Sequence, residues 1–173
     1  MTGFADATGT GCDFDALVRE HQAMVFSVAL HFLRDRALAE EVAQEVFLSL
    51  HRNLGAIQSA SHARHWLRKV AVQRAIDEGR RRKRQAVVSL SELAEPAAGD
   101  PQGDPMLGET LRRLVGTLPE APRMVMILRY QEDLDPSDIA ELMNMPVSTV
   151  KSHLQRSLAL LRQKLARRGL GEI

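Results

Sequence analysis

One stretch near the middle of the chain, residues 86–105, constrains the fold more than any other feature. It contains three prolines, two glycines and four acidic residues but no lysine or arginine. Proline and glycine interrupt regular structure, and this composition is typical of a linker. Its twenty residues reach at most about 70 Å when extended. The stretch therefore predicts two small domains, at 13–85 and 106–169, joined by a flexible acidic linker and preceded by a disordered tail at 1–12.

Both predicted domains have the apolar spacing of α-helices, with apolar residues recurring every three to four positions. The segments with this spacing are 14–32, 38–54, 63–76, 106–118, 119–130, 136–143 and 150–165. No segment alternates polar and β-branched residues, so no strands are expected. The predicted fold class is all-α.

Capping residues set the expected helix ends in the first domain. Asp35 is expected to cap the second helix, and Gly55 to end it in the left-handed position that glycine favours. Ser59 or Ser61 is expected to cap the third helix. A basic helix with an aromatic residue can hold single-stranded nucleic acid, but the apolar spacing around Trp66 favours a place in the core.

The second domain has the pattern of a helix-turn-helix. Pro119 is expected in the first turn of a helix that ends near residue 130. Asp135 and Pro136 then open a short helix, which 144–146 interrupts, and Ser148 is expected to cap a longer last helix. A short helix, a tight turn and a longer helix form the arrangement that many DNA-binding proteins use.

The last helix carries polar side chains at the positions that do not face the core. Hydroxyls, an amide and cations gather in its N-terminal half, which in a helix-turn-helix enters the major groove. Gln pairs with adenine there, and Arg or Lys pairs with guanine. The alternative is a solvated bundle helix, but the turn and the basic tail favour DNA. The residues expected to read DNA are Ser148, Thr149, Lys151, Ser152, Gln155 and Arg156.

The charges are unevenly distributed, although the formal net charge is only +1. Residues 64–84 hold nine basic and two acidic residues, and 145–173 hold six basic and one acidic. The acidic excess lies in 1–63, in 85–109 and, to a smaller extent, in 110–144. Two basic segments separated by acidic ones indicate a polyanion partner, although a basic run alone is equally consistent with a solvated helix face.

No residue pattern indicates an enzyme, a cofactor or a metal site. Glu40, Glu41, Gln44 and Glu45 form an acidic stripe, but no nucleophile, glycine-rich phosphate loop or metal-spaced cluster accompanies it. The stripe is expected to be surface or a docking face for a basic partner. The lone Cys12 excludes an internal disulfide. Because no apolar run of about 18 residues and no leader peptide is present, the protein is expected to be cytoplasmic, without membrane insertion.

Three motifs in this order resemble those of bacterial extracytoplasmic-function sigma factors, over nearly the whole chain. The segment 39–47 (AEEVAQEVF) is similar to the family's acidic motif that binds the clamp helices of RNA polymerase. The segment 66–71 (WLRKVA), with Asp77 and Arg80, is similar to the part that reads and melts the −10 promoter element. The family's −35-reading domain is similar to 118–130, 138–142 and 147–152.

The resemblance implies a transcription initiation factor that binds core RNA polymerase, directs it to promoters and assists melting by capturing unstacked bases. The implied partners are the polymerase clamp helices and flap, double- and single-stranded promoter DNA, and an anti-sigma factor. The polymerase contacts would be the acidic stripe at Glu40, Glu41, Gln44 and Glu45. The implied −10 contacts are Arg64, Arg68, Lys69, Gln73, Arg74, Asp77, Arg80 and Arg81.

The chain departs from the family pattern at several positions. Leu38 stands where an acid is usual, Gln73 where an asparagine is usual, and His153 where an arginine is common. The segment 157–159 is also less basic than usual. These differences bear on docking strength and promoter sequence and not on the class of protein.

Two other classes share parts of these patterns. The segment 149–154 (TVKSHL) also resembles the recognition helix of LuxR-like response regulators. That class carries an α/β receiver or sensing domain, whereas 14–84 has helical spacing and a basic end. A helical adaptor that binds only protein would not need two basic segments. Specific DNA binding without polymerase would favour the response-regulator class.

Overall fold

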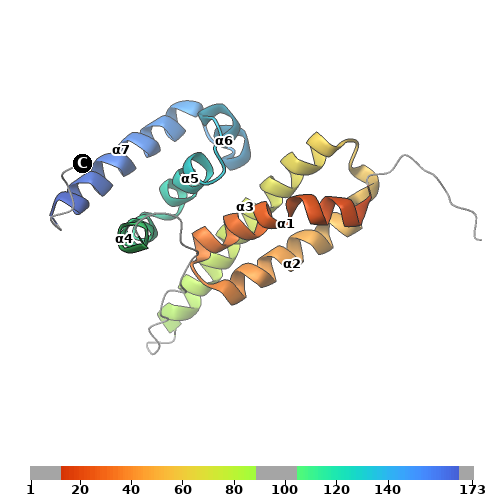
Figure 1. Cartoon of the computed structure of the whole chain (residues 1–173), viewed down its shortest axis with the longest axis horizontal. Coiled ribbons are helices and arrows are strands. Elements are labelled where there is room, and N and C mark those ends of the chain that lie inside the picture. Colours follow the sequence, from red (N-terminus) through yellow and green to blue (C-terminus); the bar gives the residue numbers. More distant parts are fainter. Residues whose placement is uncertain (1–12, 89–104, 168–173) are drawn as a thin grey trace, which may run out of the picture.

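The computed structural model describes residues 13–88 and 105–167, and every regular element in these ranges is helical (Figure 1). The all-α prediction is therefore confirmed. The predicted tail at 1–12 and most of the predicted linker, 89–104, lie outside the described residues. Over the described ranges, no helix combines the length and apolar character that crossing a bilayer requires.

The first domain consists of three helices that pack against one another. They are α1 (Phe14–Leu33), α2 (Arg36–Asn53) and α3 (Ala60–Val88), with a short 3-10 turn, η1 (Leu54–Ala56), after α2. α3 continues three residues past the predicted boundary at 85. The sequence there is Ala-Val-Val, and the first proline of the predicted linker comes only at Pro96, so nothing interrupts the helix at the predicted position.

Small residues allow α3 to pack closely on α1 and α2. Ala63, Leu67, Ala71 and Ala75 follow one another at four-residue spacing, and all four are fully buried. This spacing places them on one side of the helix. Trp66 lies beside this ridge, half-buried and packed against the core, as its spacing predicted.

Two of the expected caps in the first domain are confirmed and one is wrong. The Asp35 carboxylate accepts a hydrogen bond from the Leu38 backbone N–H at 3.2 Å, and the Ser59 hydroxyl accepts one from His62 N–H at 3.1 Å. Gly55 does not occupy a left-handed position, because the chain continues from α2 directly into η1. That turn uses ordinary right-handed backbone angles and does not require glycine.

The second domain contains four helices and has the predicted helix-turn-helix. They are α4 (Pro105–Gly116), α5 (Glu120–Tyr130), α6 (Pro136–Met143) and α7 (Val147–Ala166). Asp135 is the N-cap residue of α6, and Pro136 is its first residue, as predicted. Asn144 ends α6 in the left-handed conformation, with φ 52°. The turn between the two helices is therefore only three residues long.

Two prolines are N-cap residues, so α5 begins one position later than expected and α7 two positions earlier. Pro119 is the N-cap of α5 and not a residue of its first turn. Pro146 is the N-cap of α7, so Ser148 lies within the first turn and makes no capping hydrogen bond. The expectation that Ser148 caps α7 is therefore wrong. The fixed φ of proline already directs the chain into the helix, one residue before Val147.

The two domains pack directly against each other. α5 contacts α1, and α6 contacts α3, and Figure 1 shows the second domain lying along the side of the first. Buried residues of both domains belong to one continuous apolar cluster, which runs from Val25 and Leu67 to Met124 and Ile139. A smaller cluster holds α4 against α5 and α7.

Two leucines on α2 provide a matched test of this core. Leu50 is fully buried and Leu48 is 55% exposed. Leu50→Ala is expected to lower the free energy of unfolding by about 2–5 kcal/mol, because it leaves a cavity. Leu48→Ala removes the same atoms from the surface and should change that free energy by less than about 0.5 kcal/mol. Chemical denaturation followed by circular dichroism measures both, and equal losses would contradict the arrangement of α2.

Candidate nucleic-acid interface

The N-terminal half of α7 presents a polar face to solvent. Its opposite side packs into the domain through Val150, Ser157 and Leu161, all buried. At 100° per residue, Ser148, Ser152 and Gln155 lie away from that buried side. The side chains of Ser148, Lys151, Gln155 and Arg156 are exposed, whereas those of Ser152 and Thr149 are half-buried. The predicted DNA-reading residues are therefore brought together on one surface, with Thr149 at its edge.

The turn before α7 holds this face in a defined orientation. The Asn144 N–H donates to the carbonyls of Ala140 and Glu141 at the end of α6, and Met145 N–H donates to Ala140 O at 3.0 Å. Ile139 and Val150 are both fully buried and belong to the same apolar cluster. Such an end satisfies the last carbonyls of α6 and fixes the direction in which α7 leaves.

The predicted −10 residues on α3 do not form one uniform basic face. Lys69, Gln73 and Asp77 follow each other at four-residue spacing and are exposed, so they form a polar stripe on one side of the helix. Within the described part of the chain, none of the three side chains forms an ion pair. This stripe is the part of α3 that is open to a ligand.

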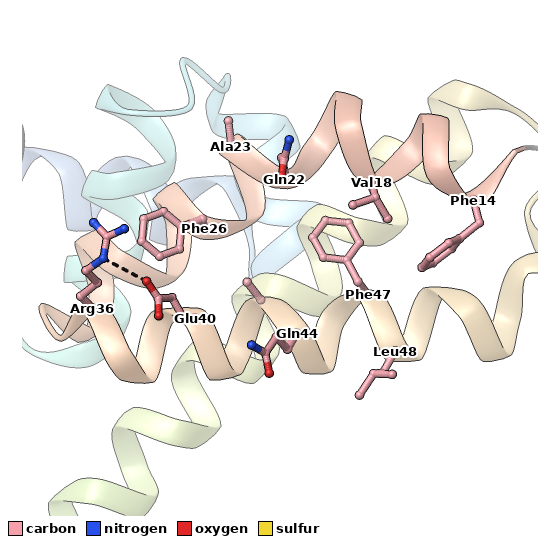
Figure 2. A pocket seen from close by; sticks show the side chains of 11 residues that line it. Phe14, Val18, Gln22, Ala23, Phe26, Arg36, Glu40, Gln44, Phe47 and Leu48 are labelled. Carbon is pink, nitrogen blue, oxygen red and sulfur yellow. Dashed lines mark hydrogen bonds and ion pairs between the residues drawn. The ribbon is translucent and has the colours of Figure 1, made fainter.

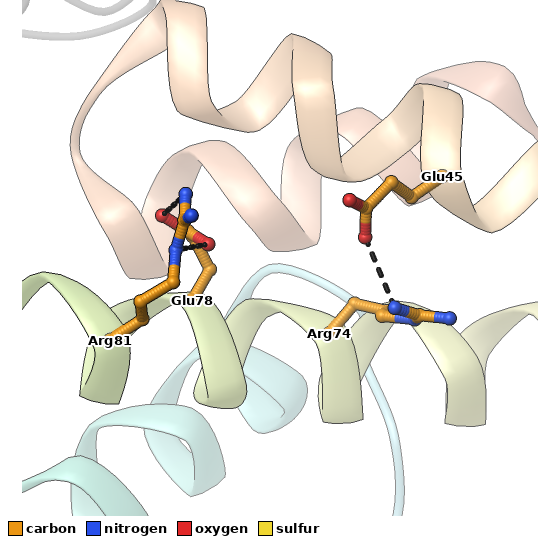
Figure 3. A network of polar contacts seen from close by, with 4 residues as sticks. All are labelled: Glu45, Arg74, Glu78 and Arg81. Atoms are coloured by element: carbon orange, nitrogen blue, oxygen red, sulfur yellow. Dashed lines mark hydrogen bonds and ion pairs between the residues drawn. The ribbon is translucent and has the colours of Figure 1, made fainter.

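The arginines among the predicted −10 residues are all paired with acidic side chains. Three pairs lie within the first domain and two reach the second domain (Figure 3 shows two of the former). The pairs within the first domain are Arg64–Glu20 at 3.2 Å, Arg74–Glu45 at 3.1 Å and Arg81–Glu78 at 2.8 Å. The high positive count of 64–84 is thus partly neutralised in the folded chain.

The acidic stripe of α2 is exposed, as expected, and adjoins an apolar groove. Glu40 pairs with Arg36 at 2.9 Å and Glu45 with Arg74, whereas Glu41 has no ion pair within the described residues. The groove, of about 790 Å³, lies between α1 and α2, and Figure 2 shows its lining. Its lining residues are Phe14, Val18, Gln22, Ala23, Phe26, Arg36, Glu40, Ala43, Gln44, Phe47 and Leu48.

Sequence reasoning did not identify this groove. Phe14, Val18 and Phe47 have the helical spacing of core residues, which predicts that they are buried. In the structure they are half-buried at the edge of the core. Exposed Leu48, which falls next to the acidic stripe, is the one signal that could have indicated an apolar surface there.

Charged contacts between the domains were also not predicted. Arg80 Nη2 lies 2.7 Å from Glu120 Oε1, and Arg68 Nη2 lies 3.7 Å from Glu132 Oε2. The Glu132 side chain is 8% exposed. Burial raises the pKa of the Glu132 carboxyl, while the Arg68 charge opposes that shift. The arrangement contains no cluster of three metal-ligating side chains within the described residues.

Both domains of the chain match families of known proteins. Residues 17–85 match the sigma-70 region 2 family and residues 108–161 match sigma-70 region 4. The RNA polymerase sigma-H factor of Pseudomonas aeruginosa is 32% identical over 159 residues, which cover 83% of this chain and 81% of that protein. The ECF RNA polymerase sigma factor SigW of Bacillus subtilis is 25% identical over 169 residues, 88% of each chain.

Solved structures show the same fold. The sigma factor RpoE from Bartonella quintana, in complex with the anti-sigma factor NepR, matches with a TM-score of 0.75 and 19% identity over 89% of this chain and 97% of that chain. CnrH, in complex with the cytosolic domain of CnrY, matches with a TM-score of 0.64 and 18% identity over 89% and 88%. The chain belongs to the extracytoplasmic-function sigma factors of the sigma-70 family. It is a promoter-specific transcription initiation factor.

Two serines at helix starts provide a test of the local geometry. Ser59 caps α3 through its hydroxyl, so Ser59→Ala is expected to lower the free energy of unfolding by about 1 kcal/mol. Ser148 makes no such bond, and Ser148→Ala should change that free energy by less than about 0.5 kcal/mol. Thermal unfolding of the two variants measures the difference. A larger loss for Ser148→Ala would mean that its hydroxyl caps α7 after all.

Proposed function

We propose that the two domains divide promoter recognition between three helix faces. The acidic stripe of α2 docks on core RNA polymerase, the polar stripe of α3 contacts −10 DNA, and the N-terminal face of α7 reads the −35 element. The observation that carries this proposal is the exposed face of α7, held by a buried helix-turn-helix. The protein itself carries no catalytic step and acts with polymerase in the cytoplasm.

The face of α7 suits the major groove. Gln155 offers an amide to adenine, and Lys151 and Arg156 offer cations to guanine or phosphate. Ser148 and Ser152 add short hydroxyls close to the helix start, where free backbone N–H groups also favour phosphate. Because these side chains are not engaged in ion pairs within the described residues, they can contact DNA without first breaking an internal contact.

The stripe of α3 suits unstacked DNA. Lys69 supplies a cation for the backbone, and Gln73 and Asp77 supply hydrogen-bonding groups for base edges. Extruding a base costs a few kcal/mol, and contacts to the captured base and its phosphates offset that cost. Melting can then proceed without ATP. Arg64, Arg68, Arg74, Arg80 and Arg81 can join these contacts when their acidic partners exchange for phosphate.

The stripe of α2 suits a basic partner surface. Glu40, Glu41, Gln44 and Glu45 lie on one exposed side of the helix, next to the exposed apolar Leu48 and the groove. We assign this combined surface to the clamp helices of polymerase, and the second domain to the flap. An anti-sigma factor is the expected regulator, as the RpoE complex with NepR illustrates for a protein of the same fold.

Glu41 provides the sharpest test of polymerase docking, since no internal ion pair is lost when it changes. Glu41→Arg is expected to reduce co-purification with core polymerase at least tenfold and to abolish promoter-specific run-off transcripts, because it places a cation against a basic partner surface. Asp138→Arg carries the same charge change at an exposed acid of α6, outside the α2 surface and the groove, that forms no ion pair within the described residues. This control should dock normally.

Unchanged docking of Glu41→Arg, or equal loss in both variants, would contradict the assignment of α2. Specific promoter binding by the protein without polymerase would instead favour an independent DNA-binding regulator. Circular dichroism of each variant checks that the helices are intact.

Gln155 and Gln163 provide a matched test of −35 reading. Both are exposed residues of α7, and Gln163 lies two turns further from the helix start. Gln155→Ala is expected to weaken discrimination at one −35 base pair by about 1–3 kcal/mol, while Gln163→Ala leaves it unchanged. Competition between promoter variants for the reconstituted holoenzyme measures this. A uniform loss on every sequence would show that Gln155 touches only phosphate.

A further inference from the structure

The side of α3 that faces α2 brings cations to the acidic stripe. Arg74 Nη1 lies 3.1 Å from Glu45 Oε2, and Figure 3 shows the Arg74 side chain reaching from α3 toward α2. One and two turns further along α3, Glu78 accepts hydrogen bonds from Arg81 at 2.8 and 2.9 Å. Hydrogen bonding to Glu78 raises the pKa of the Arg81 guanidinium. The charges of Glu41 and Glu45 on α2 add to that shift, so Arg81 also lies within the field of the stripe.

Two of the three carboxylates in the acidic stripe are already paired within the chain. Glu40 accepts a hydrogen bond from Arg36 at 2.9 Å, and Glu45 accepts one from Arg74. Glu41 is exposed and has no ion pair within the described residues. The stripe therefore presents one uncompensated negative charge, although it contains three acids.

The Arg74–Glu45 pair opposes binding of a basic partner at this place. A cation of the partner must either share the Glu45 carboxylate with Arg74, which repels it, or displace Arg74 from that carboxylate. The Arg74 and Glu45 side chains are 46% and 57% exposed. Solvent therefore screens the pair, and displacement costs little. Arg74 lowers the affinity of the stripe for a basic surface without preventing docking.

Arg74 differs in this respect from the exposed polar stripe of α3. Gln73 is the adjacent residue, so its side chain leaves the helix about 100° away from that of Arg74. Lys69, Gln73 and Asp77 form no ion pair with α2 within the described part of the chain, whereas Arg74 does. The charge of Arg74 is thus engaged with the docking stripe.

We propose that Arg74, together with Arg36, sets the affinity of this protein for core RNA polymerase by compensating acids of the docking stripe. Arg74 acts through Glu45 and Arg36 through Glu40, so both are positioning residues and Glu41 is the main anchor. The inference rests on the assignment of the α2 stripe to polymerase. An affinity held below its attainable maximum makes occupancy of a limited amount of core polymerase depend on the concentration of this protein.

Competition with the labelled wild-type chain for limiting core polymerase, in the absence of DNA, tests this in the full protein. Arg74→Gln is expected to bind core about two- to fivefold more tightly than wild type, because the competing exposed pair is lost. Arg74→Lys keeps the cation and should bind core more weakly than Arg74→Gln. Arg84→Gln is the matched control and should bind like wild type. Arg84 is an exposed residue of α3, ten positions further along, and forms no ion pair within the described residues.

The acids of the stripe provide a second test through the order of their effects. Glu41→Gln should weaken docking of the wild-type chain more than Glu45→Gln, because Glu45 shares its charge with Arg74. In the Arg74→Gln background, Glu45→Gln should cost about two- to fivefold more affinity than it does in the wild-type background. Such non-additivity is the signature of two residues that act on docking through one contact.

Unchanged or weaker core binding by Arg74→Gln, with intact helices by circular dichroism, would overturn the inference. Equal gains for Arg74→Gln and Arg84→Gln would attribute the effect to net charge and would overturn it as well, as would additive effects of Arg74→Gln and Glu45→Gln. Glu41→Arg separates the two proposals. Normal docking of Glu41→Arg rejects the assignment of α2 to polymerase, whereas lost docking without a gain in Arg74→Gln rejects only the role of Arg74.

Discussion

The close packing of α3 on α1 and α2 determines where every proposed contact surface lies. Ala63, Ala71 and Ala75 are fully buried between the helices, and a Cβ at Gly79 would lie 3.0 Å from the Phe32 ring. Because these small residues bring the backbones together, long side chains on the other sides of α3 extend either into solvent or toward the second domain. A bulkier ridge would move α3 away from α1 and displace all of these groups at once.

Features decided within one or two helical turns could be predicted from the sequence. The caps at Asp35 and Asp135 and the three-residue turn are of this kind, since periodicity and capping depend on near neighbours. The errors at Gly55 and Ser148 are also local. Gly55 and Ser148 both have a favourable preference for cap positions, but neighbouring residues determine the backbone there. The 3-10 turn continues through Gly55, and Pro146 begins α7 ahead of Ser148.

Features that depend on distant residues could not be predicted. Arg80 and Glu120 are 40 positions apart, and no local pattern pairs them. For the same reason the two basic segments look alike in the sequence but differ in the fold. The arginines assigned to −10 DNA on α3 are paired, whereas Lys151 and Arg156 on α7 form no ion pair within the described residues. Most of the candidate residues lie on exposed helix faces, as the periodicity predicts, but their ion pairing could be known only from the structure.

This difference gives the two proposed DNA-contacting surfaces different electrostatic states. Because Lys151 and Arg156 form no ion pair within the described residues, the proposed −35 contact of α7 would not require one to break. The proposed −10 contact differs, because Arg68 and Arg80 would have to exchange the carboxylates of Glu132 and Glu120 for phosphates.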